Sequence, residues 1–315
     1  RPAGDRRIGR SGGEVDHFTG CECCFSDRSG RTGIPERTSR STSRSRCVQH
    51  GAVLAVAVSS TNPAAVTFDL WQTLVFESDG SARSSIRRKI RADYGEAALS
   101  QLGESVSRET IDGALRDLSE EITVGHDEGF DRTYDEWVAH LIDRIDPDLA
   151  RRIGQAGLDT FGAVIDQSFI ESPPQLVDGA ADVLASLSSS GLKIGLISNT
   201  GLTSPATYGK WFSTINVLSS FDYIAFSNGL AVAKPSRKIF NATLSQLGVE
   251  PARALHIGDN MHTDVAGAAA AGMSTVWVRG GIDSPVNTSY DPDYTIDSMV
   301  ELLPAVDRWL ATLDG

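Results

Sequence analysis

Apolar runs with strand character alternate with amphipathic segments along most of the chain beyond residue 62. This pattern predicts strands at residues 66–68, 193–197, 223–227 and 254–258, and helices at 178–190, 237–247 and 266–271. Strand and helix patterns that alternate in this way are typical of a parallel sheet with helices on both faces. We therefore predict an α/β fold built on a doubly wound parallel sheet.

About a hundred residues after Thr73 break this alternation, because their apolar residues recur at spacings of three and four, which gives a helix one apolar face. The apolar positions of four predicted helices are Ile86, Ile90 and Tyr94; Ile111, Leu115, Leu118 and Ile122; Tyr134, Trp137, Val138, Leu141, Ile142 and Ile145; and Leu158, Phe161, Val164, Ile165 and Phe169. A crossover between parallel strands needs only one helix, so four in succession predict an inserted helical domain. We place this domain at residues 78–174 and the α/β core at 62–77 and 175–315.

Residues 1–61 differ from the rest of the chain in composition. They are rich in Arg, Ser and Gly and lack apolar periodicity. Such a segment buries too little apolar surface to offset the chain entropy lost on folding, so we expect a disordered tail. No Met precedes Met261, and the abrupt change in composition favours the interpretation that the tail is upstream sequence read in frame, with Val58 as the candidate start.

All four cysteines lie in this tail. Cys21, Cys24, Cys47 and His50 have the C-x-x-C and C-x-x-H spacings of zinc ligands. Only two large apolar residues lie between the pairs, too few to pack a zinc module, so we favour a solvated tail without zinc.

The rest of the chain is acidic and free of cysteine. The whole chain carries a net charge of −12, although residues 1–50 hold ten Arg against six Asp or Glu. An acidic body argues against a nucleic-acid partner, and the absence of disulfide-forming residues from it suits a cytoplasmic location. No apolar stretch approaches the length of a membrane span, so no membrane association is expected. The sequence is silent on oligomeric state.

Polar side chains follow two of the predicted strands. Asp69 comes directly after the first strand, and Ser198 and Asn199 come after the strand at 193–197. Ligands bind at this edge of an open parallel sheet, so Asp69 is a candidate nucleophile or metal ligand. The Ser198 hydroxyl and the backbone N–H groups of residues 198–201 can cradle an anion. A turn-forming Asp and a turn without a ligand explain the same residues equally well.

A lysine and two further carboxylates stand later in the chain. Lys234 precedes the helix at 237–247, which Ser236 can cap, and its amine can reach an anion at the sheet edge. Asp259 and Asp264 lie in the turn after the strand at 254–258. Two carboxylates in one turn repel each other unless a cation is present, and hard oxygen ligands favour Mg²⁺. A surface lysine and a pair of helix-capping aspartates are the alternatives.

Taken in order, these segments resemble the motifs of the haloacid dehalogenase superfamily of hydrolases, of the type with a helical cap inserted after the first motif. Residues 68–74 (Phe-Asp-Leu-Trp-Gln-Thr-Leu) match the first motif and residues 196–199 the second. Lys234 with Pro235 matches the third, and residues 258–264 match the fourth. The resemblance covers residues 62–315 and implies a Rossmann-like core with residues 78–174 as its cap.

The resemblance implies a Mg²⁺-dependent phosphatase that acts on a small phosphorylated metabolite. Asp69 would attack phosphorus and form an aspartyl-phosphate. Ser198, the Asn199 amide and Thr73 would hold the phosphoryl oxygens, and Lys234 would offset the charge shared by Asp69 and the phosphate.

The same resemblance places Mg²⁺ on Asp69, Asp259, Asp264 and the backbone carbonyl of Trp71. The chain departs from the family at Trp71, where its phosphatases usually carry a second Asp that protonates the leaving group. An indole N–H is neither acid nor base near neutral pH, so a rate loss of about 10²–10⁴ is expected unless another group substitutes.

Three interpretations follow from this departure. The first is a phosphatase whose missing acid comes from the cap, from His262 or from Glu77, or whose substrates have good leaving groups. The second is a 2-haloacid dehalogenase-like hydrolase, since that branch of the family also lacks the second Asp; it does not need the acidic metal turn, so we rank it second. The third is a slow or inactive phosphate-binding regulatory protein.

Overall fold

The structure, a computed structural model, describes residues 62–77, 82–280 and 289–313, which all belong to one unit of the chain. Within these residues, six strands form one parallel sheet in the order β5-β4-β1-β6-β7-β8. They are β1 (Ala65–Phe68), β4 (Lys193–Ser198), β5 (Tyr223–Phe226), β6 (Ala254–Gly258), β7 (Ser274–Val278) and β8 (Tyr294–Ile296). The predicted doubly wound α/β fold is confirmed. The tail and its candidate zinc ligands lie outside the described residues.

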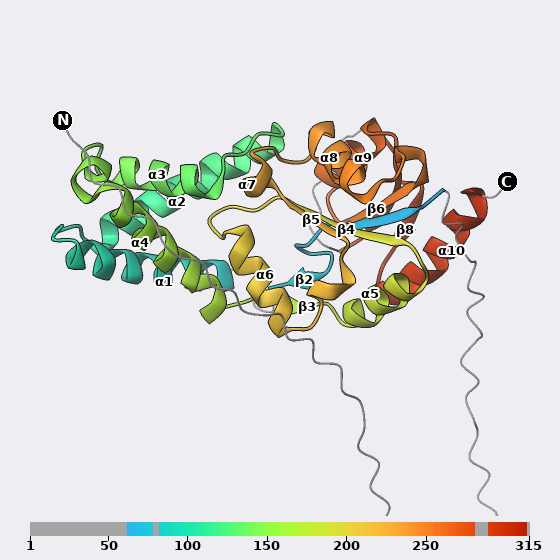
Figure 1. Cartoon of the computed structure of the whole chain (residues 1–315), viewed down its shortest axis with the longest axis horizontal. Helices are drawn as coiled ribbons and strands as arrows, with labels where there is room; N and C mark the ends of the chain where they lie inside the picture. Colours follow the sequence, from blue (N-terminus) through green and yellow to red (C-terminus); the bar gives the residue numbers. More distant parts are fainter. Residues whose placement is uncertain (1–61, 78–81, 281–288, 314–315) are drawn as a thin grey trace, which may run out of the picture. The chain divides into compact units, whose positions relative to one another are not determined.

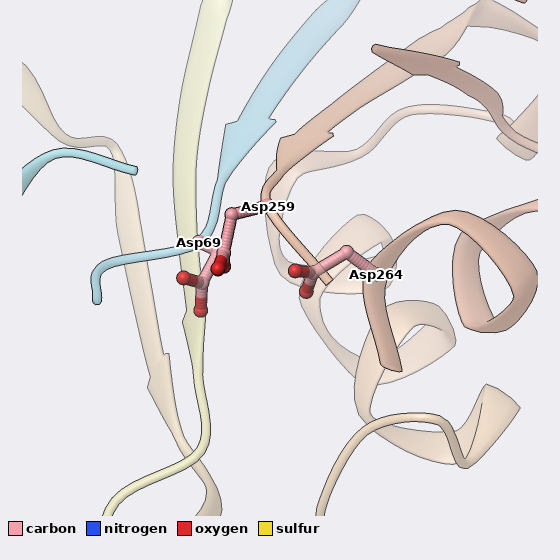
Figure 2. Close-up of side chains that lie close together, drawn as sticks. All are labelled: Asp69, Asp259 and Asp264. Carbon is pink, nitrogen blue, oxygen red and sulfur yellow. The ribbon is translucent and has the colours of Figure 1, made fainter. Parts of the chain in front are cut away.

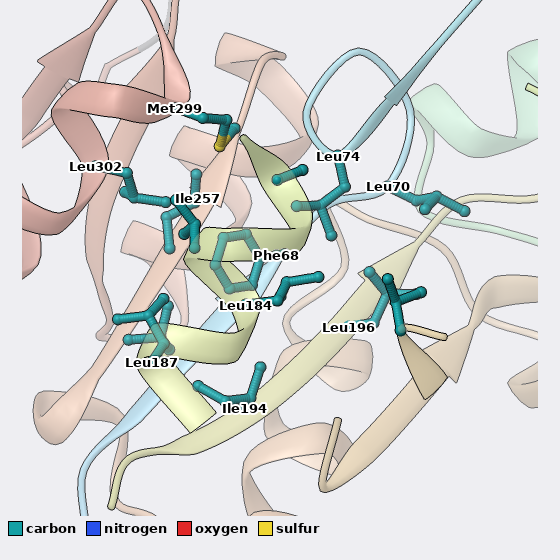
Figure 3. Close-up of a cluster of buried hydrophobic side chains, with 14 of the residues drawn as sticks. Phe68, Leu70, Leu74, Leu184, Leu187, Ile194, Leu196, Ile257, Met299 and Leu302 are labelled. Atoms are coloured by element: carbon teal, nitrogen blue, oxygen red, sulfur yellow. The ribbon is translucent and has the colours of Figure 1, made fainter. Parts of the chain in front are cut away.

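Helices cover both faces of this sheet (Figure 1). Successive side chains of a strand point to opposite faces, and Val66 and Phe68 pack with α5 (Ala180–Ser189), α6 (Pro205–Thr214) and α10 (Leu302–Leu313). Figure 3 shows Phe68 among the side chains of this cluster. On the other face, Ala65 packs with α8 (Arg237–Leu247) and α9 (Gly267–Ala270). Because both faces are buried, the strands read as continuous apolar runs.

Some predicted details differ from the structure. Ser236 is the N-cap residue of α8, but its side chain makes no capping hydrogen bond. Several elements have no counterpart among the predicted ones, and the longer ones among them are β7, α6 and α10. β7 is an apolar run that strand criteria can identify, whereas β8 has three residues, too few to show a periodicity.

Four helices occupy residues 82–171, as their spacing predicted. They are α1 (Ala82–Gln101), α2 (Arg108–Asp127), α3 (Tyr134–Ile145) and α4 (Leu149–Glu171). Their apolar side chains form a cluster of their own. Thr133 and Glu136 form a capping box at the start of α3, which satisfies backbone N–H groups that a helix cannot pair internally.

The orientation of α1 differs from the prediction. Ile86, expected on its buried face, is 44% exposed, whereas Ala92, Ala98 and Leu99 are buried. The small residues allow close packing against α2 and α4, and the charged side of the helix is turned toward a cavity described below.

The two ends of this helical segment lie side by side. β2 (Val75–Phe76) pairs antiparallel with β3 (Gln175–Leu176), with Val75 opposite Leu176. The chain thus enters the helical segment after β2 and leaves it through β3, which is paired with β2. Among the described residues, no helix is both long and apolar enough to cross a lipid bilayer.

Candidate active site

The strand order places two aspartates together at the carboxyl edge of the sheet. From β1 the chain builds β4 and β5 on one side, and β6 then pairs on the other side of β1. This reversal is where open α/β sheets bind ligands. Asp69 directly follows β1 and Asp259 directly follows β6, and the backbone N–H of Asp69 donates to the Ile257 carbonyl at 2.8 Å.

Three buried carboxylates converge there. In the part of the chain that the structure describes, one oxygen each from Asp69, Asp259 and Asp264 lies within 4.8 Å of the others. Figure 2 shows the side chains arriving from the ends of β1 and β6 and from the helical turn that follows β6. Like charges at this spacing repel each other, whereas three hard oxygen donors suit a divalent cation. The donor set therefore fits Mg²⁺.

The amine of Lys234 bridges two of these carboxylates. Its Nζ lies 2.5 Å from Oδ1 of Asp69 and 2.6 Å from Oδ1 of Asp264, and the residue is 1% exposed. Burial lowers the pKa of Lys234, but the carboxylates of Asp264 and Asp69 outweigh this effect, so the net pKa is raised and the amine stays charged. The lysine thus offsets part of the negative charge of the cluster.

The carboxyl of Asp69 is strongly perturbed by its surroundings. Burial raises the pKa of Asp69 to about 8; Lys234 opposes the rise, and Asp264 and Asp259 add to it. One amine is therefore too little positive charge for three buried carboxylates. A proton or a metal cation has to complete the balance.

Asn199 fixes the position of Lys234. Its Oδ1 accepts from the Lys234 backbone N–H at 2.8 Å, and its Nδ2 donates to the Lys234 carbonyl at 3.0 Å. This reciprocal pair ties the end of β4 to the loop before α8. The Asn199 side chain was not predicted to have this function, because the two residues lie 35 positions apart.

Asp264 is oriented by groups that the sequence analysis did not identify. His256 Nε2 lies 3.4 Å from Oδ1 of Asp264, and His256 Nδ1 lies 2.9 Å from the Thr67 hydroxyl. The Asn260 backbone N–H donates to the other carboxylate oxygen of Asp264 at 3.0 Å. Burial lowers the pKa of His256, and a neutral imidazole that accepts from Thr67 and donates to Asp264 satisfies both contacts.

Gly258 makes room for Asp264. A Cβ at position 258 would lie 2.3 Å from Cγ of Asp264 and 2.4 Å from its Oδ2. Real Cβ atoms do not approach other atoms that closely, so any other residue here has to displace the carboxylate. The close contact with Asp264, six positions later, thus explains why the fourth motif has a glycine at position 258.

The predicted phosphate-binding groups lie at the same edge. Ser198 and Thr73 are buried, and the Thr73 hydroxyl has no hydrogen-bond partner in the described part of the chain. An unpaired buried hydroxyl is available to a ligand. One predicted donor is taken, because the Thr200 N–H donates to the Ser227 hydroxyl at 2.8 Å.

A cavity of about 710 Å³ adjoins these strand ends. Trp71, Gln72 and the segment 199–203 line it together with residues of α1 and α2. Its volume is within the range of small-molecule sites.

Trp71 is held in place within this cavity. Its side chain lies close to that of Tyr208, and the Arg87 guanidinium lies 5.5 Å from the centre of its ring. Glu77, one of the two named candidates for the missing acid, lines the same cavity and forms an ion pair with Arg87. The other candidate, His262, directs its Nε2 to the Asp127 carbonyl at 3.0 Å and does not line the cavity.

Comparison with known proteins connects this chain with one family of hydrolases. A family model described as haloacid dehalogenase-like hydrolase matches residues 63–272. A glyceraldehyde 3-phosphate phosphatase of Methanopyrus kandleri is 29% identical over 77% of this chain and 96% of its own length. The human haloacid dehalogenase-like hydrolase domain-containing protein 3 is 32% identical over 42% of this chain, and the match spans about half (52%) of the human protein.

A solved structure supports the fold. The crystal structure of a 2-haloacid dehalogenase from Pseudomonas syringae superposes with a TM-score of 0.54, at 21% identity, over 78% of this chain and 99% of that protein. At this level of identity the likeness concerns the fold alone.

Proposed function

Because this chain belongs to the haloacid dehalogenase-like hydrolases, we propose that it is a Mg²⁺-dependent phosphatase that works through an aspartyl-phosphate on Asp69. The observation that carries the proposal is the buried cluster of Asp69, Asp259 and Asp264 with Lys234 between two of them. A relative supports the proposal, since the Methanopyrus kandleri protein is a glyceraldehyde 3-phosphate phosphatase, which acts on a small phosphate ester.

The proposed reaction divides into two displacements at phosphorus. In the first, an oxygen of Asp69 forms a bond to phosphorus while the bond to the ester oxygen breaks, and the departing oxygen takes up a proton. In the second, water attacks the same phosphorus and releases Asp69 and inorganic phosphate. The buried charge of Lys234 compensates the negative charge that Asp69 and the phosphoryl group share.

Asp69, Asp259, Asp264 and the Trp71 carbonyl are the proposed ligands of Mg²⁺. When bound, the cation would neutralise phosphoryl oxygens and the carboxylate cluster. Ser198, the Asn199 N–H and Thr73 are proposed to receive the other phosphoryl oxygens; the unpaired Thr73 hydroxyl supports this assignment.

Glu77 is the stronger candidate for the group that replaces the missing acid. It lines the cavity beside Trp71, and its Oε2 is buried without a hydrogen-bond partner among the described residues. His262 is disfavoured because its ring N–H is engaged outside the cavity.

Trp71 favours a second candidate function, a 2-haloacid dehalogenase-like hydrolase, because displacement of halide needs no acid for the leaving group. The three carboxylates argue against it, since attack at carbon needs no metal. A slow phosphate-binding regulatory protein is the third candidate.

One experiment separates the three. The purified chain is assayed for phosphate release from p-nitrophenyl phosphate and for halide release from 2-chloropropionate, each with Mg²⁺ and with EDTA. Phosphate release that requires Mg²⁺ and is lost in Asp69→Asn supports the phosphatase. Halide release that persists in EDTA would identify a dehalogenase, and phosphate-analogue binding without either reaction would indicate a regulatory protein.

A further inference from the structure

Four arginines line the cavity beside the proposed phosphate site: Arg87, Arg88, Arg91 and Arg116. Two carboxylates, Glu77 and Glu120, line it as well, so its ionised walls carry more positive than negative charge. At the sheet edge, Lys234 and the proposed cation already compensate the negative charge of the phosphoryl group. The proposed reaction at phosphorus therefore does not require these arginines.

Three of these arginines have carboxylate partners. Arg87 pairs with Glu77 and also donates to the Ser172 carbonyl at 2.8 Å. Arg88 lies 3.0 Å from Asp112. Arg116 lies 3.5 Å from Asp117, and both side chains are more than half exposed. Their charges are thus balanced by the protein itself or by solvent.

Arg91 differs from the other three, because within the described part of the chain its guanidinium donates only to neutral acceptors. Its Nη2 donates to the Leu202 carbonyl at 2.5 Å and to the Thr203 hydroxyl at 3.1 Å. Its Nε is buried and has no partner, and no carboxylate of the described residues forms an ion pair with it. Asp166 acts on Arg91 electrostatically, but its oxygens accept hydrogen bonds from Ser204 and Thr207.

A guanidinium that is enclosed by the protein and has no paired carboxylate can bind an anion. Burying a guanidinium without a counter-ion is unfavourable, and Arg87 nearby increases the cost. Arginine presents several N–H donors in one plane, which match the paired oxygens of a carboxylate or a phosphate. Leu202 lies only three residues beyond Asn199, so Arg91 contacts the loop that carries the predicted phosphate-binding amide.

We propose that the substrate carries a second anionic group, a carboxylate or another phosphate, and that Arg91 binds it while the sheet edge holds the phosphate ester. This inference rests on the proposed phosphatase activity and narrows its substrate class to phosphorylated acids or bisphosphates. A substrate that is neutral outside its phosphate leaves Arg91 without a counter-ion.

The test compares substrates on one three-carbon skeleton. Glycerol 3-phosphate ends in a neutral hydroxymethyl group, 3-phosphoglycerate replaces it with a carboxylate, and glycerol 1,3-bisphosphate carries a second phosphate. We expect kcat/KM to be at least about tenfold higher for one of the two compounds with a second anionic group than for glycerol 3-phosphate. The preferred compound identifies whether the second group is a carboxylate or a phosphate.

The variant Arg91→Gln removes the charge but retains a hydrogen-bond donor. It should lower that preference by about 10- to 100-fold, mainly through a higher KM for the substrate with the second anionic group, and Arg91→Lys should restore part of it. Arg151→Gln is the matched control, because Arg151 is 74% exposed, pairs with Asp148 and does not line the cavity. This control should keep the wild-type preference.

The outcomes separate this inference from the proposed function. If p-nitrophenyl phosphate is hydrolysed but the three three-carbon esters react alike, or if Arg91→Gln and Arg91→Lys slow all three equally, Arg91 is structural and the inference is wrong while the phosphatase stands. If no phosphate ester is hydrolysed, including p-nitrophenyl phosphate, both are wrong.

Discussion

The amine of Lys234 lies 2.5 Å from Oδ1 of Asp69, although 165 positions separate the two residues along the chain. Both side chains are buried, and Asp264 lies on the other side of the same amine. Removing one member of a buried charged group leaves its partners without compensation, which costs more than the intact pair contributes. The local stability of the strand ends and the proposed chemistry therefore depend on the same contacts.

Replacing Lys234 with Met should destabilise the fold and abolish phosphate release. Three buried carboxylates would remain without their amine, so we expect the free energy of unfolding to fall by about 3–5 kcal/mol. Urea denaturation measures this change. Lys193→Met is the matched control: Lys193 pairs with Asp222 at the surface, and its loss should cost about 1 kcal/mol or less. Equal losses for the two variants would contradict the importance of the buried bridge.

Mg²⁺ should raise the melting temperature of the protein. A ligand that binds only the folded state stabilises it by about 2.7 kcal/mol at a concentration 100 times its Kd. Calorimetry in EDTA and in increasing Mg²⁺ tests this, and Asp259→Asn should reduce the shift strongly. Asp297→Asn, at an exposed carboxylate paired with Arg279, should retain it. If the melting temperature of the wild-type protein does not change with Mg²⁺, the result would argue against the metal site.

Gly258→Ala should damage the acidic cluster through sterics alone. Its Cβ would overlap the Asp264 carboxylate, so we expect a loss of about 1–3 kcal/mol of stability and weaker Mg²⁺ binding. Gly209→Ala provides the comparison, because Gly209 lies inside α6 with no atom within 4 Å of its added Cβ. That substitution should be neutral or stabilising. Thermal melts with and without Mg²⁺ distinguish the two.

Trp71→Asp should increase hydrolysis if the missing acid limits the rate. A carboxyl at this position restores the residue type that the family's phosphatases carry, and we expect at least about a tenfold rise in kcat for p-nitrophenyl phosphate. Trp71→Phe, which adds no acid, should show no rise. Both variants remove the indole, so a difference between their rates reflects the added carboxyl. A flat or lower rate in a folded Trp71→Asp protein would refute the explanation.

Glu77→Gln should affect poor leaving groups more than good ones. An alkoxide needs a proton in order to depart, whereas p-nitrophenolate does not, so kcat for an alkyl phosphate should fall about 10²-fold or more and that for p-nitrophenyl phosphate much less. The same substitution weakens the ion pair with Arg87, and Arg87→Gln controls for this effect. If both variants lower both rates by the same factor, Glu77 only positions Arg87.

The sequence by itself determined the alternation of strands and helices through β1, β4, β5 and β6, the four inserted helices, and the presence of polar residues at strand ends. Asp69, Ser198 and Asp259 lie at or just after the ends of β1, β4 and β6, and parallel strands necessarily bring such ends to one edge. The family and the fold follow from these local features. The catalytic and metal-binding functions of the residues remain predictions.

Tertiary structure alone decided which side chains support the site. His256 stands in an apolar strand, and only the register between β1 and β6 places it opposite Thr67, within reach of Asp264. The spacing of α1 suggested that Ile86 is buried, yet packing of its small residues turned Arg91 toward the loop after β4. Periodicity along a chain shows that a helix has an apolar side. Which polar groups meet depends on contacts between segments that are distant in sequence, and those contacts have no local signature.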